Sequence, residues 1–273
     1  MLSWRGLQWR LLTGVAAALF FALLVLPIVA LLVRVPLGTL VARLGEPLVL
    51  QALRLSLETS LAAAAIVVSL GTPVAWLLAT REFRGKRVLE ALVDLPMVLP
   101  PTVAGVGLLL AFGRTGLAGR GLSAFGITIP FTTTAVVLAE AFIAAPFFVG
   151  AAAAGFREVE RRYLDAAATL RASPATVFFR VMLPLALPSV LAGATMSWAR
   201  ALGEFGATIT FAGNLPGVTQ TMPLAVYVAL QTDVEAAIAL SVLLVVLSFT
   251  VLLVVRALPL APATLLRAGR EPR

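Results

Sequence analysis

A charged segment, residues 155–187, interrupts a chain that otherwise consists of long apolar runs. The segment contains arginines and acidic residues in close succession: Arg157, Arg161, Arg162, Arg171, Arg180, Glu158, Glu160 and Asp165. The hydrocarbon core of a bilayer does not accept this charge density, so the segment must lie in water between two membrane spans. The sequence therefore predicts an all-α integral membrane protein, because helices satisfy their backbone hydrogen bonds internally.

The composition limits the chemistry that the chain can perform. Of its 273 residues 60% are hydrophobic and 12% are charged, whereas about a quarter of a soluble protein is charged. It contains no Cys and no His, the residues of thiol catalysis and the commonest metal ligand. We therefore expect no catalytic site, no metal site and no bound cofactor. The net charge of +8 comes from arginines that cluster at membrane edges, so no nucleic-acid partner is expected.

Six apolar runs are long enough to cross a membrane, which takes about 20 residues. They are residues 11–33, 56–79, 90–112, 131–153, 188–212 and 235–256. We interpret the first run as an uncleaved span, since the apolar core of a signal peptide is shorter, about 7–15 residues. The chain then divides into an N-terminal anchor with the first span and an external loop (1–51), a core of five spans (52–256) and a cytoplasmic tail (257–273).

The basic residues predict which side of the membrane each connection faces. Fifteen of the 21 Lys and Arg residues lie in the N-terminus, the loop after the second span, the charged segment and the tail. The loops 34–55, 113–129 and 213–233 hold five, and the first of them is expected to contain a short interfacial helix. By the positive-inside rule the basic side is cytoplasmic, so both termini and the charged segment are expected there.

Part of the charged segment has the pattern of ordered helices. Residues 161–170 contain good helix formers and no Pro or Gly, and Ser173 followed by Pro174 is typical of the start of a second short helix. One face of the first helix carries Tyr163, Ala166, Ala167 and Leu170. Two alanines on this face would let another protein surface approach closely. The alternative is a surface helix that only links two spans.

The order of residues in this segment resembles the EAA motif of ATP-binding-cassette (ABC) importer permeases. Asp165, Ala166 and Ala167 match its Glu-Ala-Ala, and Val181 with Leu183 and Pro184 matches its Ile and Leu-Pro. Arg171 replaces the motif's glycine, which bears on the backbone shape because glycine tolerates conformations that arginine does not. The resemblance implies a cytoplasmic coupling helix between spans four and five that docks on an ATPase subunit. The residues implied in coupling are Asp165, Ala166, Ala167, Leu170, Arg171, Leu183 and Pro184.

The third span is interrupted by Pro96, Pro100 and Pro101. Proline removes a helical hydrogen bond and kinks the helix, and such breaks are tolerated where the backbone packs against protein or lines a cavity. The interruption is either a kink required for packing or a moving pore segment. The string 100–105 is similar to one in molybdate permeases, which favours a pore segment with Pro100, Pro101 and Thr102 as gate candidates.

Arg200 and Glu204 place two charges near the middle of the expected fifth span. They are one helical turn apart and can pair, which lowers the cost of burying each charge. We expect either a structural ion pair that locks this span to its neighbours or a role in gating, and both residues are gate candidates. Glu140 in the fourth span is another membrane acid, for which structural pairing is expected.

The residues that follow Arg200 extend the resemblance. The strings 201–208, 212–217, 219–221 and 223–227 are similar to those of molybdate and tungstate permeases, and the similarity covers about residues 52–256. It implies the type I ABC importer fold and a homodimer of this chain among the lipids of a prokaryotic cell membrane. It also implies two cytoplasmic ATPase subunits that use ATP and a periplasmic or extracellular oxyanion-binding protein. The implied function is the passage of molybdate or tungstate into the cytoplasm, without catalysis by this chain.

Other functions stay open at the level of the sequence. Sulfate and thiosulfate permeases share the general plan of the molybdate permeases. An ion-coupled secondary transporter would need internal repeats and functional membrane carboxylates, for which only Glu140 and Glu204 are available. A membrane enzyme is the other alternative, but without His or Cys and without a close carboxylate pair the sequence shows no evident site for metal or nucleophilic chemistry. The chain also has no G-x-x-x-x-G-K-[ST] string, so the nucleotide site is expected on a separate subunit.

Overall fold

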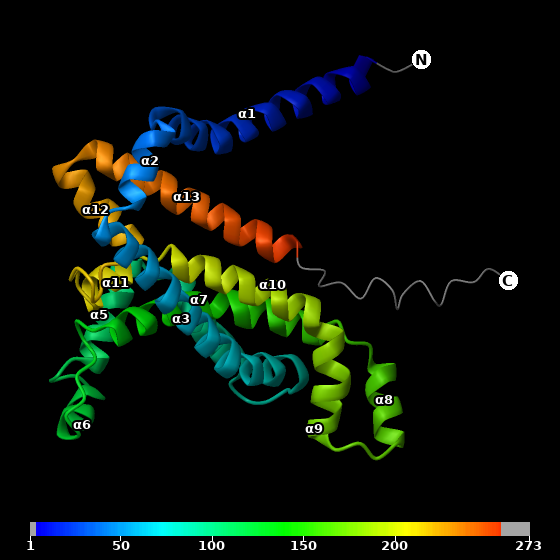
Figure 1. Ribbon diagram of the computed structural model, residues 1–273. Helices are drawn as coiled ribbons and strands as arrows, with labels where there is room; N and C mark the ends of the chain where they lie inside the picture. Colours follow the sequence, from blue (N-terminus) through cyan, green and yellow to red (C-terminus); the bar gives the residue numbers. More distant parts are fainter. Residues whose placement is uncertain (1–3, 258–273) are drawn as a thin grey trace.

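The computed structural model describes residues 4–257, so the predicted tail lies outside the described residues except for Ala257. Within 4–257 all regular structure is helical (Figure 1). The helices are α1 (Trp4–Arg34), α2 (Leu37–Leu44), α3 (Pro47–Thr80), α4 (Lys86–Val98), α5 (Pro101–Phe112), α6 (Gly119–Ala124), α7 (Thr133–Arg157), α8 (Arg161–Thr169), α9 (Pro174–Val177), the π-helix η1 (Phe178–Met182), α10 (Leu183–Leu202), α11 (Gly206–Phe211), α12 (Met222–Thr232) and α13 (Val234–Ala257).

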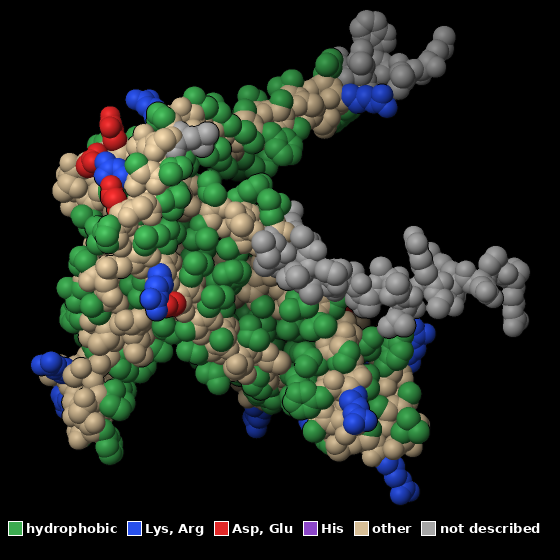
Figure 2. All heavy atoms as spheres, in the orientation of Figure 1, with side chains coloured by type: hydrophobic (Ala, Val, Ile, Leu, Met, Phe, Trp, Pro, Cys, Tyr) green, Lys and Arg blue, Asp and Glu red, His purple; other side chains and the backbone are tan. Residues whose placement is uncertain are grey.

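The helices supply five or six of the expected spans. In the part of the chain that the structure describes, five are long and apolar enough to cross a membrane, and there are six if α4 and α5, bent by 117° at the break between them, count as one span. Charged side chains gather at the ends of the molecule, and hydrophobic side chains cover much of the surface between them (Figure 2). This distribution matches an apolar belt in the bilayer with polar ends in water.

Helix α7 is the centre of the fold, and α3 and α10 pack along it (Figure 1). Small side chains allow this close packing, as shown by the fully buried Ala139, Ala144 and Ala152. Between membrane helices, tight packing of small residues replaces the hydrophobic driving force, because lipid tails are as apolar as the side chains. Helix α1, in contrast to α7, is exposed, and none of the residues in its apolar stretch Trp9–Arg34 is buried.

The second span begins at Pro47 rather than at residue 56, and two later boundaries are also wrong. The fifth span was expected at 188–212, but the continuous helical stretch runs from Pro174 to Leu202 and stops before Glu204. The expected external loop 213–233 contains helix α12. Both later errors have one cause: apolar composition continues through Phe211 and again after Met222, and composition alone does not register where the backbone turns.

The last span begins with a charged cap. The Ala236 N–H donates to Asp233 Oδ1 over 3.0 Å, and Arg43, in α2, lies 3.1 Å from the same carboxylate. The hydrogen bond from Ala236, with the charge of Arg43, lowers the pKa of Asp233 below its ordinary value. This contact also ties the short helix α2, which the sequence predicted in the first external loop, to the start of α13.

Candidate functional site

The break in the third span follows directly from its prolines. A residue that precedes proline is disfavoured in the helical region, and both Leu99 and Pro100 precede a proline. Both have extended backbones, with φ −67°, ψ 135° at Leu99 and φ −55°, ψ 131° at Pro100. Pro101 then occupies the start of α5, where its missing N–H costs nothing. Pro96, also expected to interrupt the span, lies buried inside α4 and does not end it.

Two glycines bring α5 and α11 into direct backbone contact. A Cβ on Gly105 would lie 2.7 Å from Thr210 Cβ and 2.8 Å from the carbonyl oxygen of Ala207. A Cβ on Gly206 would lie 2.8 Å from Pro101 Cβ and 3.3 Å from the Thr102 nitrogen. Helix α11 is therefore packed against the N-terminal turns of α5, beside the break in the third span.

The ion pair between Arg200 and Glu204 forms as predicted, but at a chain break rather than inside a span. Arg200 is in the last turn of α10, and Glu204 follows the end of that helix. Their side chains approach to 2.9 Å, with Glu204 1% exposed and Arg200 30% exposed. Glu204 Oε1 also accepts a hydrogen bond from the Ala207 N–H in the first turn of α11, where the helix dipole favours a negative charge.

Gate candidates from two separate spans thus meet at one place. Pro101 and Thr102 contact Gly206, which is two residues from Glu204, and Pro100 directly precedes them. The broken third span and the broken fifth span therefore form a single cluster at one end of the molecule. The sequence identified the residues of this cluster but not their contact.

A second group of buried polar residues escaped prediction. The Thr59 hydroxyl, in α3, donates to Glu140 Oε1 over 3.0 Å. Glu140 is therefore paired, as expected, but its partner is a neutral hydroxyl. The Trp198 indole N–H donates to Ser60 Oγ over 3.0 Å, and the Met222 N–H donates to Ser56 Oγ over 2.7 Å. These bonds tie α3 to α7, α10 and α12. The signal in the sequence was the helical spacing of Ser56, Thr59 and Ser60, which places small polar groups on one face of the second span.

The charged segment folds into the two expected short helices. Helix α8 covers Arg161–Thr169 with Leu170 as its C-cap, and the N–H of Thr176 donates to Ser173 Oγ at the start of α9. In α8, Ala167 is 6% exposed, and Leu164 packs on the membrane core beside it. The side chains that face outward include Asp165, Ala166 and Leu170, the last 82% exposed. A partner protein can therefore reach Ala166 and Leu170, while Ala167 packs inward.

Arg171 adopts the conformation that glycine usually supplies. Its φ is +51°, in the left-handed region. Its N–H donates to Ala168 O over 2.9 Å, and the N–H of Ala172 donates to Ala167 O over 3.1 Å. These two bonds form a Schellman motif, which ends a helix and satisfies its last carbonyl groups. The turn therefore keeps the shape expected of the motif's glycine, with backbone strain at Arg171.

Leu183 and Pro184 lie inside one continuous helical stretch that joins α9 to α10. The residues just before them, Phe178–Met182, form the π-helix η1. Proline inside a helix lacks a donor and its ring clashes with the carbonyl group four residues earlier, here that of Arg180. A wider π turn at this point accommodates Pro184 without ending the helix. Leu183 and Pro184 are thereby linked through unbroken helix to Arg200 at the other end of α10, whereas the candidates in α8 are joined to this stretch by the turn at residues 170–173.

The coupling candidates and the gate candidates lie at opposite ends of the fold. Helices α8 and α9 are at one end of α10 and α7, and α5 and α11 are at the other (Figure 1). Within the described residues no group of three or more acidic side chains could hold a metal ion. The arrangement consists of an exposed short helix at one end, a long connecting helix, and breaks in two spans at the other end.

Comparison with known proteins agrees with this arrangement. Residues 71–260 match the family described as binding-protein-dependent transport system inner membrane component. The chain belongs to that family. It is therefore a permease component of an ABC transporter and a multi-pass protein of the inner membrane, as the resemblance implied.

Relatives of this permease include a molybdenum and a sulfate transport system permease protein. The molybdenum transport system permease protein ModB of Mycobacterium tuberculosis is 46% identical over 246 residues, 90% of this chain and 92% of the relative. A sulfate transport system permease protein of Synechococcus elongatus is 37% identical over 261 residues, 94% of this chain and 91% of the relative. In structure, the permease matches a chain of a bacterial alginate ABC transporter crystallised with its alginate-bound periplasmic protein. The TM-score is 0.72 at 14% identity, covering 93% of this chain and 96% of that chain, and it confirms the importer fold.

Proposed function

We propose that this chain is the permease of an importer that carries molybdate or tungstate into the cytoplasm, driven by ATP hydrolysis in a separate subunit. The observation that carries the substrate assignment is the higher identity to molybdenum permeases than to a sulfate permease. Molybdate and tungstate are dianions of nearly the same size, and a separate oxyanion-binding protein selects between them before delivery. Sulfate transport is the second candidate, since the sulfate permease aligns along almost the whole chain.

The working transporter is proposed to contain two copies of this chain, two ATPase subunits and an external binding protein. The exposure of α1 supports the homodimer, because no residue of its apolar stretch Trp9–Arg34 is buried by the rest of the chain. A helix that stands away from its own bundle offers a large surface to a second copy. The fold match to an importer chain crystallised with a periplasmic binding protein is consistent with the external partner.

Helix α8 is proposed to transmit the motion of the ATPase. Its outward residues Asp165, Ala166 and Leu170 form the contact, and the Schellman turn at Arg171 fixes the angle at which the next segment leaves. From there Leu183 and Pro184 continue without interruption into α10, which ends at Leu202 and holds Arg200, beside Glu204, in its last turn. Displacement of α8 therefore acts through one stiff helix on the cluster formed by α5 and α11.

The breaks in the third and fifth spans are proposed to permit alternating access to the two sides of the membrane. At Pro100 and between Leu202 and Gly206 the chain can change direction without breaking a regular helix. Because α5 and α11 are held together through Gly105 and Gly206, they are proposed to move as one unit that opens and closes the passage. Both termini and α8 are proposed to lie in the cytoplasm, where ATP is available, and the distribution of basic residues supports this orientation.

Transport by the reconstituted complex tests this function. The permease and its ATPase are placed in vesicles, the binding protein is added outside, and uptake of labelled molybdate, tungstate and sulfate is measured with and without ATP inside. We expect ATP-dependent uptake of molybdate or tungstate and at least tenfold less of sulfate. Uptake of sulfate alone would assign the second candidate, and uptake driven by an ion gradient without ATP would contradict the proposal.

A further inference from the structure

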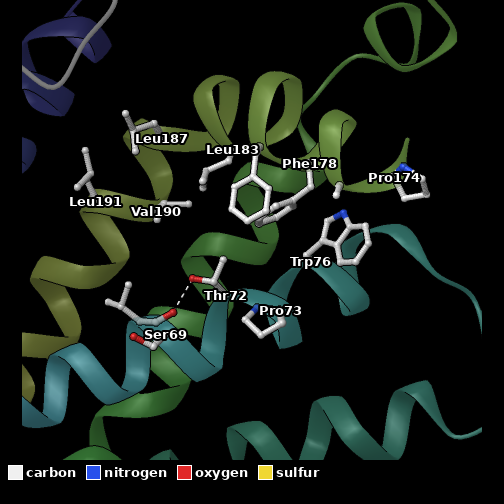
Figure 3. Close-up of a pocket in the computed structure, with 13 residues that line it drawn as sticks. Ser69, Thr72, Pro73, Trp76, Pro174, Phe178, Leu183, Leu187, Val190 and Leu191 are labelled. Atoms are coloured by element: carbon white, nitrogen blue, oxygen red, sulfur yellow. Dashed lines mark hydrogen bonds between the residues drawn. The ribbon is translucent and has the colours of Figure 1, made fainter. Parts of the chain in front are cut away.

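An apolar pocket of about 780 Å³ opens between α3 and the α9–η1–α10 stretch (Figure 3). On α3 its wall extends from Val68 to Trp76, and on the opposite side from Pro174 to Leu191. Phe178 and Leu183 point into the space that faces Trp76 (Figure 3). The volume lies in the range of clefts that bind small molecules. None of the proposed transport residues except Leu183 contributes to it.

The pocket suits hydrocarbon. Two of the polar groups at its wall are already used within the chain. The Thr72 hydroxyl donates to the Val68 carbonyl oxygen, and the Trp76 indole N–H donates to the Met182 sulfur over 3.3 Å. The remaining wall is almost entirely aliphatic and aromatic carbon. A ligand group that fills this space is stabilised by apolar contact and meets few hydrogen-bonding groups.

The pocket occupies the half of the membrane on the α8 side. Val68 is twelve residues before the end of α3 at Thr80, which corresponds to about 18 Å of helix. The hydrocarbon core is about 30 Å thick, so the pocket covers roughly the depth of one leaflet. With the proposed topology this is the inner leaflet, and its mouth lies at the level of the lipid headgroups.

Basic residues lie close along the chain to the residues that line the pocket. Three exposed arginines lie within about five residues of lining residues: Arg81 after the end of α3, Arg171 before α9, and Arg180 in η1. In the part of the chain that the structure describes, none of the three is in an ion pair. Basic pockets between membrane helices at the cytoplasmic side attract anionic lipid headgroups.

We propose that this pocket binds the acyl chains of an anionic phospholipid of the inner leaflet, whose phosphate lies against Arg171 and Arg180. The π-helix supports a ligand site, because π turns are rare and are frequent at functional sites. Here Phe178 and Phe179, both in η1, supply two of the aromatic walls. The lipid would fill the wedge between α3 and the stretch that joins α8 to α10, and so stabilise the connection between coupling segment and membrane.

Charge favours a lipid over a second copy of this chain as the occupant. Residues 81–87 and 157–180 carry nine Lys and Arg residues against four acidic residues, so two copies that met at this end would bring like charges together. An anionic headgroup offsets the same charges. The choice of the inner leaflet rests on the proposed topology. Lipid binding is measured without transport, so a failure to bind lipid would leave the proposed function untouched.

Lipid retention by the purified permease–ATPase complex tests the site. The complex is stripped of lipid in detergent, mixed with equal amounts of phosphatidylglycerol and phosphatidylethanolamine, and the bound lipid is counted by native mass spectrometry. We expect about one tightly held phosphatidylglycerol per permease. Ser69→Trp, which fills the pocket, should lower this occupancy at least fivefold. Ala65→Trp, at an exposed position on α3 outside the pocket, should leave it unchanged.

Two charge-reversal variants test the headgroup contact separately from the acyl-chain contact. Arg180→Glu at the mouth should remove the preference for phosphatidylglycerol over phosphatidylethanolamine, whereas Arg84→Glu in the exposed loop after α3 should keep it. Equal phosphatidylglycerol occupancy in all four variants would overturn the proposal. So would a Ser69→Trp complex that separates into single permeases with unchanged lipid content, because the pocket would then hold a second copy.

Discussion

The guanidinium group of Arg200 lies 2.9 Å from Oε2 of Glu204, although the helix that carries Arg200 ends before Glu204 is reached. The other carboxylate oxygen accepts the N–H of Ala207 in α11. One buried carboxylate therefore holds the end of α10 and the start of α11 together. Since α11 packs on α5, this ion pair lies where the two broken spans meet.

Removing Arg200 should destabilise the permease, because a carboxylate that is 1% exposed would lose its counter-charge. Breaking a buried pair costs about 3–5 kcal/mol, and the partial exposure of Arg200 places Arg200→Ala at the lower end. Glu204→Gln keeps an acceptor for Ala207 and should cost less. The exposed pair Arg54–Glu58, at 2.6 Å, is the control, and Arg54→Ala should change stability little, because solvent screens the pair. Thermal unfolding in detergent gives the comparison, and equal losses for both arginines would contradict it.

The contact between α5 and α11 can be tested on a pair of glycines in one helix. Gly105→Ala would place a Cβ 2.8 Å from the Ala207 carbonyl oxygen, and we expect a loss of about 1–3 kcal/mol together with slower uptake. Gly107→Ala meets nothing within 4 Å, so stability should stay the same or rise by up to about 1 kcal/mol through helix propensity. Normal uptake and stability in Gly105→Ala would show that α5 and α11 need not stay in contact.

The proposed topology predicts which introduced cysteines an impermeant reagent can reach, and the natural chain has none. Leu117→Cys, at a position 95% exposed in an expected external loop, should be labelled on intact cells. Arg84→Cys, in the basic loop between α3 and α4, should be labelled only after the cells are opened. Labelling of position 84 from outside would reverse the orientation and place α8 away from ATP.

The features that the sequence predicted well are those determined by local chemistry. Consecutive prolines force extended backbone at Leu99 and Pro100, and Ser173 with Pro174 starts a helix, whatever surrounds them. Arg200 and Glu204 are close enough along the chain to pair in almost any local fold. Hydropathy found the spans because each needs about 20 apolar residues.

The features that the sequence missed depend on contacts between distant segments. The apolar run through Phe211 gave no sign that α10 ends at Leu202, because the break is held by Glu204 and by packing against α5. The inward position of Ala167 depends on Leu164 reaching the membrane core, which periodicity within α8 does not reveal. The bond between Thr59 and Glu140 joins residues 81 positions apart.

Arg171 should be replaceable by glycine with a gain in stability. Left-handed backbone costs a residue with a Cβ about 1–2 kcal/mol, and Arg171 has a φ of +51°. Arg171→Gly should therefore slow hydrogen exchange at the amides of residues 171 and 172 about fivefold or more, since about 1.4 kcal/mol is a factor of ten. Arg171→Ala removes the same charge but keeps the strain, so its exchange should match that of the natural chain. A similar slowing in both variants would assign the effect to charge.

The outward face of α8 provides the test of coupling. Ala166 is exposed beside Leu170, so Ala166→Glu should leave the membrane fold intact while it places a charge and a longer side chain in the ATPase contact. Such a mismatch costs a few kcal/mol when it is buried in an interface. We expect a permease that inserts and dimerises normally but loses most of the co-purifying ATPase and of ATP-driven uptake.

Ala168→Glu is the matched control for this experiment, because Ala168 is also exposed but lies about 200° around the helix from Ala166. This variant should keep the ATPase. Ala167→Glu is expected to fail for a different reason: Ala167 is 6% exposed, so the charge would be buried within the permease itself and lower its yield and stability. Retention of the ATPase and undiminished uptake in Ala166→Glu would show that α8 only connects two spans. No other exposed helix between α7 and α10 presents small side chains in the order of the EAA motif.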